Sequence, residues 1–167
     1  SAQYRFATPL LRSGDRLVMA CDVGGNRLTA MDETGAIALN LSTEGTLLDA
    51  DLSSGDAICF AELGEAEKTV LTVYDKSQNQ IFQFYSASRY MNQCAVSSDG
   101  SYLCAAALGQ KNGAFESSAV IFSTDQEEPL TEVSLGNQMI LEMRYLGNET
   151  FCALGENSIL YFHIDGT

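Results

Sequence analysis

Tryptophan is absent from the 167-residue sequence, and histidine, proline and basic residues are scarce. A single histidine argues against a serine–histidine–aspartate triad and against a histidine-rich metal site. Nine lysines and arginines stand against 22 aspartates and glutamates, which gives a net charge of −13. A field of this sign repels phosphate backbones and anionic lipids. We therefore expect no nucleic-acid partner and no membrane contact from this segment.

Long apolar runs and paired cysteine motifs are missing as well. No stretch of about 18 apolar residues is present, and the N-terminus does not resemble a signal peptide. The five cysteines lack Cys-x-x-Cys spacing, and most lie inside apolar runs where a free thiol behaves as a small hydrophobe. The sequence thus predicts buried free thiols, no metal site and no cofactor.

A turn signal recurs along the chain at a nearly fixed period. It reads SGD around Gly14, SSGD around Gly55, SSDG around Gly100 and LGNE around Gly147, with spacings of 41, 45 and 47 residues. A short apolar strand-like run precedes and follows each turn. Self-similarity at this period is typical of repeat architectures.

A second signal closes the next strand of each unit. Runs of β-branched and aromatic residues stop at or just before an aspartate, namely Asp32, Asp75, Asp125 and Asp165. An aspartate in this position can accept a hydrogen bond from the backbone two residues on, so we expect these four to be structural turn residues. Alternating runs such as QIFQFYS follow three of the turns, and no amphipathic helix is indicated.

Four short antiparallel strands per unit predict an all-β chain of about four β-propeller blades. The expected blades cover residues 4–43, 44–88, 89–137 and 138–167, and the last blade is incomplete. The pattern resembles the WD-repeat, YVTN and quinoprotein-like propeller class over essentially the whole chain. It departs from a regular WD repeat because Met31, Tyr74, Thr124 or Ile164 stands where tryptophan would precede aspartate, and because the Gly-His element is missing.

The sequence is also similar to a propeller family of unknown function from Gram-positive gut bacteria. Members of that family carry an N-terminal membrane anchor, so the resemblance implies an extracytoplasmic propeller tethered by a segment outside this chain; a cytoplasmic location is the alternative. Four units leave three ways to close a ring: a fragment of a longer propeller, a compact four-bladed ring, or two half-rings that pair. We expect self-association or pairing with missing blades.

Polar residues on the first strand of each unit are candidates for a ligand site at the mouth of the central channel. Asp49 and Asp51 share one strand face, and Gln93, Glu142 and Arg144 hold corresponding positions in later units. Loops at 62–69 and 109–115 are expected to project from one face of the propeller, where binding commonly resides.

We favour a non-enzymatic binding or scaffold module for a protein or surface ligand, with no catalytic residues. A propeller hydrolase or lactonase with a metal in the channel is the alternative. A quinoprotein dehydrogenase is the weakest possibility, because the tryptophans typical of that repeat are absent.

Overall fold

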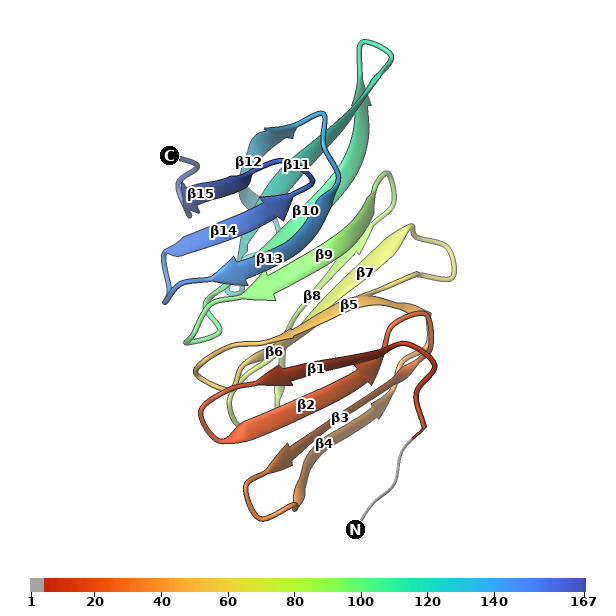
Figure 1. The fold of residues 1–167 in the computed structure, drawn as a ribbon, viewed down its shortest axis with the longest axis vertical. Helices are drawn as coiled ribbons and strands as arrows, with labels where there is room; N and C mark the ends of the chain where they lie inside the picture. Colours follow the sequence, from red (N-terminus) through yellow and green to blue (C-terminus); the bar gives the residue numbers. More distant parts are fainter. Residues whose placement is uncertain (1–4) are drawn as a thin grey trace.

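The computed structural model describes residues 5–167, and every regular element in that range is a β-strand. The strands form four antiparallel sheets in chain order, which we call blades 1 to 4 (Figure 1). Blade 1 contains β1 (Pro9–Ser13), β2 (Leu17–Asp22), β3 (Arg27–Asp32) and β4 (Ile37–Ser42). Blade 2 contains β5 (Leu47–Leu52), β6 (Ile58–Glu62), β7 (Thr69–Tyr74) and β8 (Gln80–Ser86).

Blade 3 has the same order, and blade 4 has three strands. Blade 3 contains β9 (Tyr90–Val96), β10 (Tyr102–Lys111), β11 (Ala114–Ser123) and β12 (Pro129–Gly136). Blade 4 contains β13 (Ile140–Tyr145), β14 (Thr150–Gly155) and β15 (Ile159–His163). Each strand pairs with its sequence neighbour, so every blade is a simple up-and-down meander. The predicted all-β propeller architecture is confirmed.

Three hydrophobic cores hold the blades together, one between each consecutive pair. The core between blades 2 and 3 includes Leu71 and Phe122, and that between blades 1 and 2 includes Met19 and Ile58. The core between blades 3 and 4 includes Phe151. Blades 2 and 3 are covered on both faces, which explains why strands such as β6 and β7 are apolar at nearly every position.

The outer faces of the two end blades carry exposed apolar side chains. No hydrophobic cluster joins blade 4 to blade 1 within residues 5–167. Leu11 on blade 1 is 67% exposed and Ile159 on blade 4 is 64% exposed. The two end blades meet near the axis instead, where Arg12 of β1 lies 3.3 Å from a carboxylate oxygen of Glu142 of β13.

The β10–β11 hairpin differs from the sequence prediction of a long loop over 109–115. Both strands run for ten residues and are joined by the two-residue turn Asn112-Gly113. Asn112 and Gly113 have φ values of 52° and 81°, the left-handed conformation that suits this pair in a tight hairpin. The hairpin extends beyond the neighbouring strands as a ribbon (Figure 1).

Candidate functional site

The innermost strands of the four blades bring charged side chains from distant parts of the chain together. Asp51 of β5 forms an ion pair with Arg144 of β13 and lies 4.0 Å from the Nε of Arg12. Arg144 Nε donates to Glu142 Oε1 over 2.9 Å. We call these four residues, together with Asp49, the axial cluster. Asp51, Glu142 and Arg144 were predicted channel residues, and in the structure Arg144 contacts both carboxylates.

The two aspartates of the axial cluster bind the backbone of the next blade. Asp49 Oδ2 accepts a hydrogen bond from the N–H of Cys94 over 2.9 Å, and Asp51 Oδ2 accepts one from the N–H of Val96 over 3.3 Å. These donors lie on β9, the inner edge strand of blade 3, which has no strand partner on that side. The carboxylates therefore satisfy edge groups that would otherwise be buried without a partner.

Burial dominates the electrostatics of this pair. Desolvation raises the pKa of Asp49 to about 6, although the Cys94 N–H and Arg12 both favour its ionised form. The pKa of Asp51 is also raised by desolvation, against the opposing effect of Arg144. The raised pKa values reflect the burial of both carboxylates in the contact between blades 2 and 3.

Gln93 makes a hydrogen bond within its own strand, and Arg12 joins the predicted set. The Gln93 amide donates to the backbone carbonyl of its neighbour Asn92 over 3.0 Å. Arg12 was missed because the sequence LLRS gives no sign that its arginine faces residues 39 and 130 positions away. Its place on the first strand of a unit, matching Arg144, was the available signal. Ligand binding by these residues stays a prediction.

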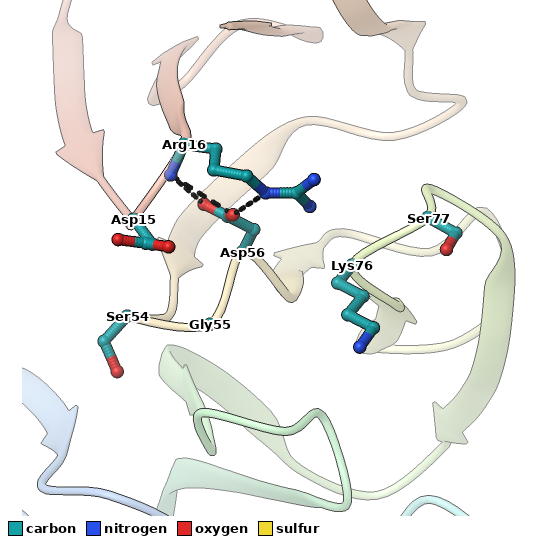
Figure 2. A pocket seen from close by; sticks show the side chains of 7 residues that line it. All are labelled: Asp15, Arg16, Ser54, Gly55, Asp56, Lys76 and Ser77. Atoms are coloured by element: carbon teal, nitrogen blue, oxygen red, sulfur yellow. Dashed lines mark hydrogen bonds and ion pairs between the residues drawn. The ribbon is translucent and has the colours of Figure 1, made fainter.

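A second set of contacts links the Gly/Asp turns of successive blades. Asp56, in the β5–β6 turn, accepts hydrogen bonds from the N–H groups of Arg16 and Leu17 over 3.0 and 3.1 Å. It also pairs with Arg16 Nε over 3.0 Å (Figure 2). A side chain at Gly14 would collide with the Asp56 carboxylate, so this close approach requires glycine. A recess of about 480 Å³ lies beside this contact, with Lys76 on its far side.

The same turns continue the linkage through blades 3 and 4. Ser54 Oγ donates to Ser98 Oγ over 3.0 Å, between blades 2 and 3. The N–H of Ser98 donates to the Gly147 carbonyl over 3.1 Å, and the N–H of Asp99 donates to Asn148 Oδ1 over 3.1 Å. The repeated turn signal in the sequence thus marks a continuous row of contacts between blades.

The four predicted turn aspartates lie at or shortly after the end of the third strand of their blades. Asp32, Asp75 and Asp165 each accept a hydrogen bond from the backbone N–H two residues on, over 2.8 to 3.0 Å. Their pKa values are lowered, chiefly by the Thr34 hydroxyl at Asp32, the N–H of Asn79 at Asp75 and the Thr167 hydroxyl at Asp165. Asp125 instead accepts a hydrogen bond from the hydroxyl of Ser123.

The cysteines and the histidine form no reactive arrangement among residues 5–167. All five cysteines are free, and four of them are buried. Burial raises the pKa of Cys21 to about 12. His163 is exposed on β15, with its Nδ1 3.4 Å from Thr150 Oγ1. No group of three His, Cys, Asp or Glu side chains in the described range has the geometry of a metal site. No helix in that range is long and apolar enough to cross a membrane.

An open groove of about 1230 Å³ lies between blades 1 and 2. Its floor is the outer half of blade 2, where Thr72, Tyr74, Gln83 and Tyr85 lie on one sheet face. Its rim combines the β4–β5 connection at 43–46 with the loop that follows β6, which the sequence predicted to project from the propeller. No sequence pattern indicated that these two segments and the face of β8 enclose one groove.

Comparison with known proteins supports the fold. A search among curated proteins found no match. The chain is similar to the crystal structure of the Cps50 (Swd1) β-propeller domain of Myceliophteria thermophila, with a TM-score of 0.61, 14% identity, and coverage of 93% of this chain and 51% of that one. It is also similar to Kuenenia stuttgartiensis hydrazine synthase, with a TM-score of 0.64, 11% identity, and coverage of 92% and 45%.

The chain spans about half the length of these two solved structures. At such low identity the similarity shows the fold alone. A family model described as "Family of unknown function (DUF5711)" matches residues 1–167, the whole of the sequence. The chain therefore belongs to the DUF5711 family, and residues 5–167 fold as four blades of a β-propeller.

Proposed function

We propose that the chain is a non-enzymatic binding module that presents propeller surfaces to a protein ligand. The observation that carries this proposal is the engagement of Asp49 and Asp51. Both are buried against blade 3, and each accepts a backbone N–H from β9. Carboxylates held in this way join the blades. They do not line the open groove, which lies between blades 1 and 2. The propeller fold fits such a scaffold role in general.

The alternative, a hydrolase or lactonase with a metal in the channel, makes a different prediction for the same residues. We expect calcium, magnesium, manganese and zinc each to leave the melting temperature of the chain within about 1 °C, because Asp51 is already paired with Arg144. A rise of several degrees that disappears in Asp49→Ala or Glu142→Ala would refute the scaffold proposal. For each variant, the melting temperature with metal is compared with that of the same variant without metal. A general loss of stability in a variant therefore does not affect the comparison.

We further propose that the outer faces of blades 1 and 4 pack against blades of a second copy of the chain. Their exposed side chains include Leu11, Val18, Leu154, Ile159 and Tyr161. These outer faces are apolar sheet faces, like the faces that pack together in the three cores. An exposed apolar face of this kind is an interaction surface. Light scattering is expected to show a dimer that Ile159→Lys dissociates. A strict monomer at high concentration contradicts this part of the proposal.

We also propose an extracytoplasmic location, with the tether outside this chain. The resemblance to anchored bacterial propellers supports it. Protease treatment of intact cells of the source organism, followed by detection of the chain with an antibody, tests it. Protection from the protease in intact but not in lysed cells would contradict the proposal.

A further inference from the structure

The outer half of the junction between blades 1 and 2 has an open side, which is formed by one face of β8. Phe82 of β8 is buried in the core between blades 2 and 3. The other face of β8, which points to blade 1, carries Gln80, Gln83 and Tyr85, all of them exposed. Tyr85 is 56% exposed. Leu39 and Leu41 of β4 pack against the core of this junction from blade 1, and the groove lies along the polar face of β8.

The floor of the groove is ordered by its own hydrogen bonds. The Tyr85 hydroxyl donates to Gln83 Oε1 over 2.8 Å, and Gln83 Nε2 lies 3.4 Å from Thr72 Oγ1. Phe60 and Tyr74 stack with ring centres 6.2 Å apart at the inner end of the floor. Aromatic rings and amides thus lie ready to contact a ligand without having to be ordered by it.

The rim of the groove is fixed by contacts between two loops. The N–H of Gly45 donates to Glu62 Oε2 over 2.8 Å, and the N–H of Leu63 donates to the Thr46 carbonyl over 2.9 Å. A side chain at Gly45 would collide with the Leu63 carbonyl, so the two loops are in close contact. This arrangement places four glutamates around one opening: Glu44, Glu62, Glu65 and Glu67.

The charge of the groove has one sign. Among the described residues that line it there is no lysine or arginine. Lys68, which follows the rim in sequence, has its ammonium 5.3 Å from the ring centre of Tyr90 on blade 3. Glutamates at the rim and exposed tyrosine at the floor complement a positively charged side chain, through charge attraction and through cation–π contact.

We infer that this groove binds a lysine- or arginine-bearing segment of a protein partner. The inference rests on the proposed binding function and names the chemistry of its ligand. The ammonium or guanidinium groups face the glutamates of the rim, and the aliphatic stems lie on Tyr85 and Tyr74. The amides of Gln80 and Gln83 are positioned to bond the backbone of the bound segment.

Fluorescence anisotropy with short labelled peptides tests the inference on the whole chain. One peptide alternates lysine and serine, one alternates glutamine and serine, and both are measured at physiological salt. The lysine peptide is expected to bind at least fivefold more tightly than the glutamine peptide. The double variant Glu65→Gln/Glu67→Gln is expected to weaken the lysine peptide about fivefold or more, and Tyr85→Ala about threefold or more.

Matched controls separate the groove from the general acidity of the chain. Glu127→Gln/Glu128→Gln removes the same charge from an exposed turn of blade 3, and Phe115→Ala removes an exposed aromatic ring from the β10–β11 hairpin. Both controls should change the affinity less than twofold. Equal weakening by the control and groove variants, no binding of the lysine peptide, or tighter binding of the glutamine peptide would each overturn the inference. The proposed binding function itself would be refuted only by the metal-induced rise in melting temperature described above.

Discussion

Asp56 offers the most direct test of how the blades are joined. Its side chain is 2% exposed and accepts the N–H of Leu17, which is itself buried, and the N–H of exposed Arg16. A buried N–H that loses its acceptor costs about 1–3 kcal/mol, whereas water can replace the acceptor for Arg16. Arg16 has a side chain that is 65% exposed, so its ion pair adds at most about 1 kcal/mol.

The backbone at Asp56 adds a second contribution. Its φ of 68° lies in the left-handed region, where alanine costs about 1–2 kcal/mol while glycine and asparagine are tolerated. We therefore expect Asp56→Ala to lower the free energy of unfolding by about 3–4 kcal/mol, Asp56→Gly by about 2–3 kcal/mol and Asp56→Asn by about 1 kcal/mol. For a chain of this length, the alanine variant should melt about 10 °C lower than the parent.

Urea unfolding of the three variants, with Arg16→Ala as the control for the ion pair, measures these differences. The order alanine, glycine, asparagine tests the backbone and the side chain separately. If Asp56→Ala unfolds within about 0.5 kcal/mol of the parent, neither the carboxylate bonds nor the left-handed backbone stabilises the junction, and the reasoning is refuted.

Two further predictions concern the junction between blades 2 and 3. Burial raises the pKa of Asp49 to about 6, so the folded chain binds its proton more tightly than the unfolded chain does. Stability should therefore fall as the pH rises from about 4 to about 6, by up to about 3 kcal/mol relative to Asp49→Asn, which does not titrate. Urea midpoints of both proteins at pH 4 and pH 7 check this, and a pH-independent difference contradicts it. Gly55→Ala should lower the free energy of unfolding by about 2 kcal/mol or more, because its Cβ would collide with the backbone carbonyl of Ser98. Gly109→Ala, whose Cβ would meet nothing closer than 3.6 Å, should stay within about 0.5 kcal/mol of the parent in the same assay.

The repeat architecture could be predicted because its signals are local. Each Gly/Asp turn reverses the chain within a few residues, and the strands beside it alternate or run apolar according to their burial. The strand that precedes each turn is the innermost strand of its blade, as β5 and β9 show. Such signals require no knowledge of which distant segment packs against them.

The candidate sites were less predictable because their partners carry no side-chain signature. Asp49 and Asp51 bind backbone N–H groups of β9, which almost any sequence would supply. Arg12 meets Glu142 across 130 positions of the chain. The polar alternation of Gln83 and Tyr85 in β8 is typical of an outer strand facing solvent, and only the position of blade 1 turns that face into the floor of a groove.

The placement of the three cores also determines how the molecule can open. Detaching blade 1 or blade 4 disrupts one core, whereas displacing blade 2 or blade 3 disrupts two. In such a one-dimensional series of neighbours, local unfolding costs least at the ends and most in the middle. Thermal fluctuations should therefore begin at the terminal sheets and leave the central pair as the last ordered unit.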